Sequence, residues 1–547
     1  MNPQPTTIYR AKRILTMNPA NPEATHVAVR GDRILGAGSL ADLAVWGEHE
    51  VDDRFADKVL MPGFVEGHSH TMEGTFWRYV YCGFFDRMDP DGKIWPGCDS
   101  IEAVIERLRR RDAELPAGEP MAGWSVDPLY YGDRRLTRAD LDQVSTERPI
   151  GVLHASGHIM NVNSKALEMG GLLRTGIDHP GIPLADDGLP QGELQGPDPM
   201  MLVNTHVGFD RGDLAGDEPG LRQFARLCVR TGVTTAADLA SLLPDEAVDM
   251  MLRVTGEDDF PTRIVSLRRF QSLTPKELID RAAELKGRST DRLRLGMVKV
   301  VADGSVQGFT ARIRWPHYVD GRNGLWYITP EQLRETYDLA LERGIHIHTH
   351  TNGDEATVLV LDTMEAALCR HPSPDHRFTI QHCQLADAAQ FRRMKALGMC
   401  ANLFSNHHYF YGEQHLTKTV GPERARRMNA CATALREGVP LAIHSDAPVT
   451  PLGPLFTAWC AINRLTVKSQ VLGEHERIGL DDALRTITLG AAYTMKLDGE
   501  VGSIEAGKRA DFAVLEHDPL EVGGADLKDV GVWGVVQGGR IFAAEDI

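Results

Sequence analysis

The feature that most limits the fold is a series of short apolar runs, most of them followed by a segment with helical periodicity. The runs are residues 64–70, 232–239, 261–267, 296–303, 345–350, 378–382, 399–404 and 441–446. Residues 330–344 show the helical pattern, with apolar side chains at helical spacing and Gly344 as a stop signal. Eight strand–helix units predict an α/β fold, a (β/α)8 TIM-like barrel.

One interval is too long for a plain barrel. Residues 71–231 separate the first run from the second, whereas one strand–helix unit needs only a few tens of residues. We therefore predict a large insertion, residues 75–230, after barrel strand 1. Because the loops at the carboxyl ends of the strands form the barrel mouth, we expect the insertion to cover that mouth.

Both ends of the chain are rich in strand-like segments. Residues 7–62 contain apolar or alternating runs broken by Gly-Asp and Gly-Ala, and residues 510–543 contain similar runs with Gly-Gly turns. We expect a composite β-sandwich domain, residues 1–62 and 497–547. The metal-dependent barrel would then span residues 63–496.

Composition limits the partners that the chain can have. The 547 residues are 42% hydrophobic and 25% charged, with a net charge of −17, which argues against nucleic acid and anionic membranes. No run approaches the length of a membrane span, and the N-terminus lacks an apolar signal core. Eight scattered cysteines without a C-x-x-C motif indicate reduced thiols. We expect a cytoplasmic protein with a small-molecule substrate.

Polar side chains stand where the predicted strands end. In the first run, His68 and His70 occupy alternate positions and so point to one face of the strand. Other strands contribute Lys299, His350, His382 and Asp446. Because barrel active sites form at the carboxyl ends of the strands, these groups are expected to meet. Imidazoles offered together suit zinc or a similar metal.

Each of these positions also has a simpler interpretation. Lys299 could form a salt bridge with Asp303, and single histidines are common in cores. His346 and His348 share a face with the strand-end histidine but lie deeper, so we expect core positions for them. His444 is likewise expected one layer below the strand end, in a supporting position. Only the whole set, at these strand ends and in this order, favours a metal site.

The same segments resemble the amidohydrolase superfamily, in particular the family-3, YtcJ-like metal-dependent amidohydrolases. The resemblance covers nearly the whole chain, although Glu66 stands where many relatives carry Asp. The similar motifs are PGFVEGHSH, VKVVADGS (298–305), HTNGDEA (350–356), IQHCQ (380–384), HSDAP (444–448) and GSIEAGKRADFAVL (502–515), with GHIMNVNSKALEMGG in the insertion.

The resemblance implies two divalent metal ions, usually zinc, and a homodimer is a further expectation from family habit. Position by position, the more buried metal would be held by His68, His70 and Asp446, and the other by His350 and His382. Lys299, carboxylated by CO2, would bridge them. Burial lowers the pKa of a lysine amine, which must lose its proton before it can attack CO2.

The expected reaction is hydrolysis of a C–N bond in an amide, N-acyl or N-formyl compound. A metal-bridging hydroxide would attack the carbonyl carbon, and Asp446 would carry its proton to the leaving nitrogen as catalytic base and acid, with Lys299 also a catalytic residue. Aromatic residues in the insertion and loops indicate an apolar or aromatic substrate. The candidate substrate-binding residues are Trp77, His158, Asn161, Asp303, His407, His408 and Tyr409.

Three alternatives remain open from the sequence. A deaminase or other C–N hydrolase could use one metal on the same barrel, and metal content would separate it from the two-metal enzyme. A decarboxylase could use the same site without hydrolysis. A barrel that binds a small molecule and regulates another process would need no catalysis, but the complete ligand set argues against it.

Overall fold

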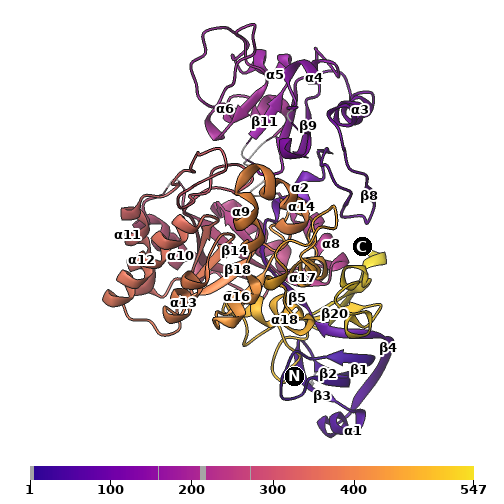
Figure 1. Ribbon diagram of the computed structural model, residues 1–547. Helices are drawn as coiled ribbons and strands as arrows, with labels where there is room; N and C mark the ends of the chain where they lie inside the picture. The colour runs from indigo at the N-terminus through magenta and orange to yellow at the C-terminus, as the bar shows by residue number, and fades with distance from the viewer. Residues whose placement is uncertain (1–4, 133, 158, 210–216, 272) are drawn as a thin grey trace. The chain divides into compact units, whose positions relative to one another are not determined.

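The computed structural model describes residues 5–132, 134–157, 159–209, 217–271 and 273–547 (Figure 1). These residues form two compact units. The first combines Met1–His70 with Ala225–Ile547, and the second is Thr71–Phe224. No described helix has both the length and the apolar character that crossing a bilayer requires.

An eight-stranded parallel sheet forms the centre of the first unit. Its strand order is β5-β13-β14-β15-β16-β17-β18-β19. A parallel bridge between Ser69 and Ala447 joins its two edges, so the sheet is nearly closed as a barrel. The strands are β5 (Phe64–Ser69), β13 (Val233–Ser241), β14 (Arg263–Arg269), β15 (Leu293–Val301), β16 (Ile347–Thr351), β17 (Thr379–His382), β18 (Cys400–Leu403) and β19 (Leu441–Ile443). All eight predicted runs are strands, and the predicted α/β barrel is confirmed.

Helices alternate with these strands, and α10, α11 and α12 flank them in Figure 1. The sequence of α11 shows why such helices begin and end where they do. Thr329 and Gln332 form a capping box, Pro330 occupies the first turn, and Gly344 ends the helix in a left-handed conformation. The helices are α8 (Glu218–Arg230), α9 (Asp245–Gly256), α10 (Pro275–Lys286), α11 (Pro330–Arg343), α12 (Asp354–Arg370), α13 (Ala388–Ala396), α14 (His407–Gln414), α15 (Gly421–Arg427), α16 (Cys431–Arg436), α17 (Pro454–Asn463), α18 (Leu480–Thr486) and α19 (Leu489–Thr494).

Strands from both chain ends pair in one seven-stranded sheet, in the order β22-β21-β20-β4-β1-β2-β3. The C-terminal strand β20 pairs antiparallel with the N-terminal strand β4, so residues far apart in the sequence share one core. That these strands form a β-sandwich with the expected limits stays a prediction. The strands are β1 (Thr6–Leu15), β2 (Glu23–Arg30), β3 (Arg33–Gly38), β4 (His49–Pro62), β20 (Phe512–Leu515), β21 (Val532–Gln537) and β22 (Arg540–Ala543).

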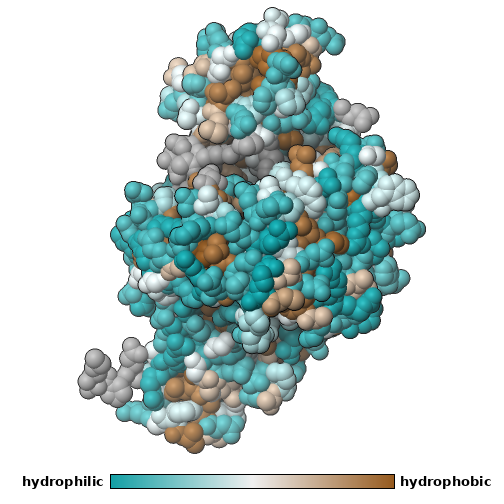
Figure 2. Space-filling view, turned by 90° about the vertical axis from the view of Figure 1, so that its left-hand side faces the viewer, coloured by the Kyte–Doolittle hydropathy of each residue, from teal (hydrophilic) through white to brown (hydrophobic). Residues whose placement is uncertain are grey.

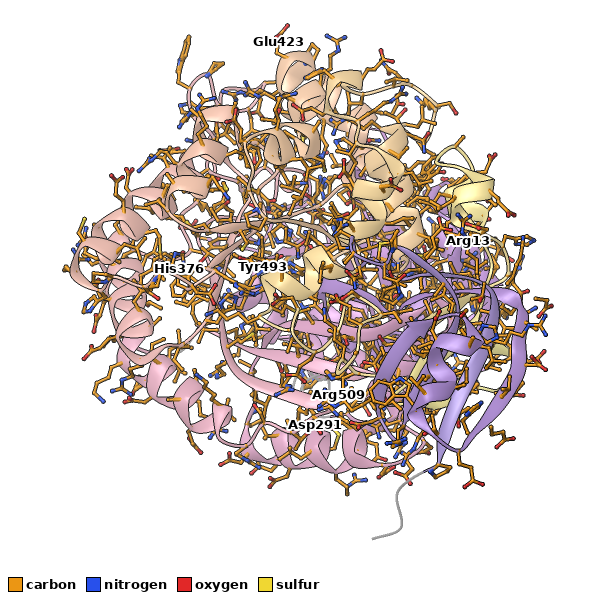
Figure 3. The ribbon with its side chains drawn as sticks, turned by 90° about the horizontal axis from the view of Figure 1, so that it is seen from below. Arg13, Asp291, His376, Glu423, Tyr493 and Arg509 are labelled. Atoms are coloured by element: carbon orange, nitrogen blue, oxygen red, sulfur yellow. The ribbon has the colours of Figure 1, made fainter. Side chains whose placement is uncertain are left out.

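Arginine side chains connect the barrel to this terminal sheet. Arg509 pairs with Asp291 at 2.5 Å and also with Asp32 (Figure 3). Arg263 on β14 lies 2.6 Å from Asp511, and both side chains are almost completely buried. Removing one partner of a buried ion pair leaves the other charge without compensation.

We therefore expect Arg263→Met to lower the free energy of unfolding by about 3–5 kcal/mol. Lys12→Ala is the matched control, because its pair with Glu521 is more than half exposed on average and such pairs contribute about 0–1 kcal/mol. Urea unfolding of the two variants measures the difference. Equal midpoints would contradict a stabilising role for the buried pair.

The second unit has its own sheet and its own apolar core. Five strands pair in the order β12-β11-β10-β9-β6, and β7 pairs with β8. That the predicted insertion covers the barrel mouth stays a prediction. The elements are α2 (Met72–Phe76), β6 (Val80–Tyr81), β7 (Arg87–Met88), β8 (Ile94–Trp95), α3 (Ile101–Asp112), β9 (Met121–Val126), α4 (Arg138–Asp142), β10 (Ile150–His154), β11 (Ile159–Val162), α5 (Ser164–Met169), β12 (Glu193–Gln195) and α6 (Pro197–Met201).

The face of the molecule in Figure 2 is mostly hydrophilic, with apolar side chains in separate patches. This pattern agrees with the net charge of −17. The apolar side chains that do reach the surface include Val45, Trp315 and Met201, which lie on three separate elements of the chain.

Candidate metal centre

Strand β5 and the segment after β19 bring three potential ligands together. His68 Nε2 and His70 Nε2 each lie 3.3 Å from Asp446 Oδ1. The ligand atoms of these three residues all lie within 4.8 Å of one another. The two histidines converge as the alternating strand pattern predicts, and Asp446 comes from the strand that bridges to β5.

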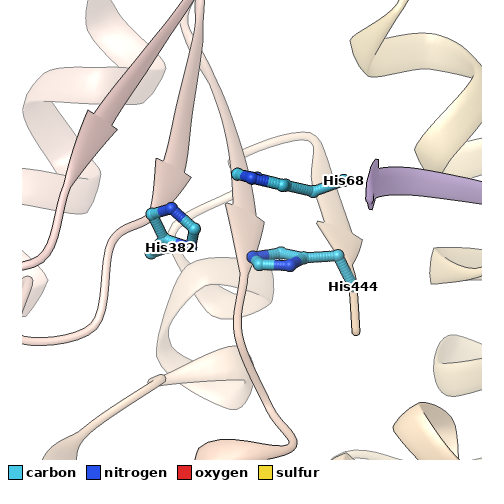
Figure 4. A group of neighbouring side chains, drawn as sticks. All are labelled: His68, His382 and His444. Atoms are coloured by element: carbon cyan, nitrogen blue, oxygen red, sulfur yellow. The ribbon is translucent and has the colours of Figure 1, made fainter. Parts of the chain in front are cut away.

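A second group of three potential ligands shares His68 with the first. It consists of His68, His382 and His444, whose ligand atoms also lie within 4.8 Å of one another (Figure 4). The rings of His68 and His444 stack at 4.6 Å, and those of His382 and His444 are 5.0 Å apart. Both nitrogens of His444 and Nδ1 of His382 are buried without a hydrogen-bond partner among the described residues.

The sequence-based expectation of a supporting position one layer deeper for His444 stays a prediction, although its ligand atom lies within 4.8 Å of those of His68 and His382. Alternation along β19 correctly places its side chain on the same face as Asp446. It does not reveal which rings of the neighbouring strands His444 contacts, because those contacts depend on how far the strands are staggered.

Lys299 lies on β15, and its side chain is almost completely buried. Its Nζ has no hydrogen-bond partner among the described residues. Burial lowers the pKa of this amine to about 7, although the charge of Asp446 opposes the shift. A substantial neutral fraction at neutral pH is the form that can attack CO2.

His350 lies near the carboxyl end of β16, as the sequence predicts. Its ring lies 4.5 Å from that of His382, which places the fifth- and sixth-strand histidines side by side. His350 Nε2 lies 3.2 Å from the carbonyl oxygen of Gly304 and 3.1 Å from Asn352 Nδ2. The six expected metal-binding residues therefore come from neighbouring strand ends of one barrel.

The electrostatics favour neutral imidazoles beside an ionised carboxylate. Burial, followed by the charges of Lys299 and His382, holds the pKa of His68 well below its usual value. Burial alone would raise the pKa of Asp446, but the hydrogen bond from His70 and nearby positive charges lower it below the ordinary value. Neutral imidazole and carboxylate are the forms that bind a metal ion.

The backbone is strained at two of these positions. His382 and Asp446 have φ angles of 67° and 53°, in the left-handed region that residues other than glycine rarely adopt. Such conformations persist where the surrounding structure imposes them, and they cluster at functional sites. The strain thus supports a functional interpretation of both strand ends.

Glu66 links the ends of β5 and β19 beneath the ligands. Its carboxyl group accepts hydrogen bonds from Ser445 Oγ at 2.9 Å and from the backbone N–H of His68 at 3.2 Å. Burial raises the pKa of Glu66 to about 8. Glu66 therefore supports the segments that carry His68 and Asp446, a role that its position in the sequence does not reveal.

The candidate substrate-binding residues are divided between the two units. Trp77 and Asn161 belong to the second unit, where Trp77 packs against Tyr81 and Trp124. The Asn161 amide bonds to His154 and, at 2.6 Å, to the carbonyl oxygen of Leu136, which suits a structural role. His158 lies outside the described residues.

Asp303 organises a turn rather than facing open space. Its carboxylate accepts backbone N–H bonds from Asn352 at 2.9 Å, Gly353 at 2.8 Å and Arg312 at 2.9 Å. The side chain is fully buried, and burial raises its pKa to about 7. These three contacts give Asp303 a structural role in the turn, and its contact with the substrate stays a prediction.

The segment after β18 contains His407, His408 and Tyr409. His407 packs against Phe404, whose ring also stacks on His444 at 4.8 Å, so His407 is one ring away from the candidate ligands. His408 instead bonds to the carbonyl oxygen of Met428 at 3.0 Å. Tyr409 packs against Phe456 and Trp459. Of the three, His407 has the placement that best suits a substrate contact.

Two amides at this site were not singled out from the sequence. Gln381 and Asn402 lie on β17 and β18, are fully buried and contact each other at 3.0 Å. The available signal was a polar residue inside an otherwise apolar strand, where a core side chain is expected. Both contribute to the hydrogen bonds around His68.

Comparison with known proteins places these observations in a family. The family model described as "Amidohydrolase family" matches residues 56–543. The chain belongs to the amidohydrolase family. It is therefore an enzyme of the hydrolase class, and the resemblance found in the sequence motifs is confirmed.

Relatives and solved structures match along most of their length. The putative amidohydrolase YtcJ of Bacillus subtilis is 26% identical over 98% of this chain and 98% of its own. The N-substituted formamide deformylase of Arthrobacter pascens is 25% identical over 95% of each chain. An uncharacterised metal-dependent hydrolase from Pyrococcus horikoshii has a TM-score of 0.72 at 20% identity, covering 95% of this chain and 99% of its own, which supports the fold.

Proposed function

We propose that this amidohydrolase is a two-metal enzyme that cleaves the C–N bond of an N-formyl, N-acyl or related amide with an apolar or aromatic substituent. The observation that carries the proposal is the convergence of His68, His70 and Asp446 within reach of the charge of Lys299, a buried lysine whose Nζ has no hydrogen-bond partner among the described residues. This donor set of imidazoles and carboxylate fits zinc, and a carboxylated Lys299 would add an anionic bridge. The name of the deformylase relative supports N-substituted formamides as the first substrates to test.

Bound metal ions would supply Lewis-acid polarisation of the carbonyl group and acidification of water. Residues of the chain would transfer the proton and contact the substrate. Asp446 Oδ1 would hold the proton taken from the attacking water and return it to the leaving nitrogen. His407, one ring away through Phe404, would contact the substrate near the barrel mouth.

The test is a metal and substrate experiment on the purified protein. We expect about two metal equivalents by elemental mass spectrometry and amine release from N-substituted formamides or N-acyl amines. Removal of the metal by a chelator should abolish the activity, and zinc should restore it. Full activity after complete metal removal would contradict the proposal, as would a metal-loaded protein that cleaves none of these C–N compounds.

A one-metal C–N hydrolase, such as a deaminase, is the second candidate. The observation that favours it is the group of His68, His382 and His444, which offers three imidazoles to one ion without Lys299. Metal content separates the candidates, because this arrangement requires about one equivalent rather than two. Loss of metal in His444→Ala with no effect of Lys299→Ala would support the second candidate.

A further inference from the structure

A hydrogen-bonded chain of buried side chains runs beneath the candidate ligands across four barrel strands. It contains Asn402 on β18, Gln381 on β17, His348 on β16 and His68 on β5. Gln381 is at its centre. Gln381 Oε1 lies 2.7 Å from His68 Nδ1 and 3.0 Å from Asn402 Nδ2, and Gln381 Nε2 lies 2.6 Å from His348 Nδ1.

The direction of each bond follows from one backbone group. Asn402 Nδ2 also lies 3.0 Å from the carbonyl oxygen of Gly67, which can only accept a hydrogen bond. The Asn402 atom in that position must therefore be the amide nitrogen. It donates both to Gly67 and to Gln381, so the Gln381 atom facing it must be the amide oxygen.

The tautomer of His68 is then determined. An amide oxygen that faces a ring nitrogen at 2.7 Å requires a proton on that nitrogen, so His68 carries its proton on Nδ1. The lone pair of neutral His68 is left on Nε2, the atom 3.3 Å from Asp446 Oδ1. This is the atom that belongs to the group of candidate ligands.

We infer that Gln381 is a positioning residue for the metal centre, which fixes His68 in the Nδ1–H tautomer and aims Nε2 at the metal, with Asn402 fixing the orientation of the Gln381 amide. The inference rests on the proposed function only in requiring that a metal is bound. Residues that orient a ligating histidine through its other nitrogen commonly change metal affinity 10–100-fold when replaced.

Two substitutions test the inference by different routes. Gln381→Leu keeps a similar size but removes the acceptor for His68 Nδ1–H. Asn402→Asp keeps the shape but presents an oxygen to Gln381, so that the Gln381 amide would turn its nitrogen toward His68 and favour the wrong tautomer. We expect each variant to bind zinc about 10–100-fold more weakly than the unmodified protein in a chelator competition assay.

Gln390→Leu is the matched control. Gln390 is a buried glutamine on α13 whose amide bonds to the carbonyl oxygen of Asp354 at 2.7 Å and not to a candidate ligand. We expect it to lower the melting temperature of the metal-free protein without changing zinc affinity. The melting temperatures of all three metal-free variants show whether each is folded.

The outcomes separate this inference from the proposed function. Unchanged zinc affinity in a folded Gln381→Leu variant would overturn the inference while leaving the metal centre intact. If Gln381→Leu does not fold, unchanged affinity in Asn402→Asp overturns it in the same way. An unmodified protein that binds zinc but cleaves no C–N compound would defeat the proposed function alone, because zinc affinity still reports on Gln381.

Discussion

Asp446→Asn is expected to reduce kcat by about 10²–10⁴-fold, the range for loss of a general acid–base group. The asparagine keeps the shape of the side chain but can no longer hold a proton taken from water. Asp446 is placed for this role because Oδ1 lies 3.3 Å from Nε2 of both His68 and His70 and Oδ2 lies 3.7 Å from His382 Nδ1. The positive φ of Asp446 shows that the surrounding structure imposes its position.

Steady-state kinetics on the best C–N substrate, together with metal content, measures this effect. Asp498→Asn is the matched control, because Asp498 is a partly exposed carboxylate that pairs with Arg377 at 2.7 Å. We expect the control to keep both rate and metal. If Asp446→Asn retains its metal and also more than about a tenth of kcat, Asp446 is not the proton carrier.

The strands of the barrel could be predicted from the sequence because each buried strand is a short apolar run with turn signals around it. The carboxyl ends of several strands could also be predicted, because their apolar runs end in a polar residue, as β16 does near His350 and β17 does at His382. The fold follows from this regular alternation. The terminal sheet was predictable for the same reason, because β4 ends in a buried apolar run and β20 consists of one.

The contacts within the candidate site could not be predicted in this way. They depend on how neighbouring strands are placed relative to one another, and the sequence of a single strand does not show that. Stagger across the barrel sets the height of each side chain, so the pattern of one strand does not show that the His444 ring stacks on those of His68 and Phe404. The sequence leaves Asp303 open between a substrate contact and a structural turn residue, because it does not show that three backbone N–H groups from two later segments converge on the carboxylate. Gln381 and Asn402 acquire their roles only through contacts with β5, several hundred residues earlier in the chain.

Lys299→Ala is expected to lower both metal content and kcat if the enzyme uses two metals. The substitution therefore distinguishes the two-metal candidate from the one-metal candidate. If carboxylated Lys299 bridges two ions, its loss should remove about one of two metal equivalents and, since a metal contributes several kcal/mol to the transition state, lower kcat about 10²–10⁴-fold. The structure supports this role, because Nζ is buried without a described hydrogen-bond partner and burial lowers its pKa to about 7.

Carbon dioxide provides an independent measurement of the same group. Purification of the unmodified protein in CO2-free buffer should lower its metal content and rate, and bicarbonate should restore both, whereas Lys299→Ala should not respond. With ¹³C-bicarbonate, the unmodified protein should show a carbamate NMR signal that the variant lacks. Two metals and full rate in Lys299→Ala would contradict the bridge. One metal in both proteins would instead support the one-metal candidate, and loss of that metal in His444→Ala would assign it to the group of His68, His382 and His444.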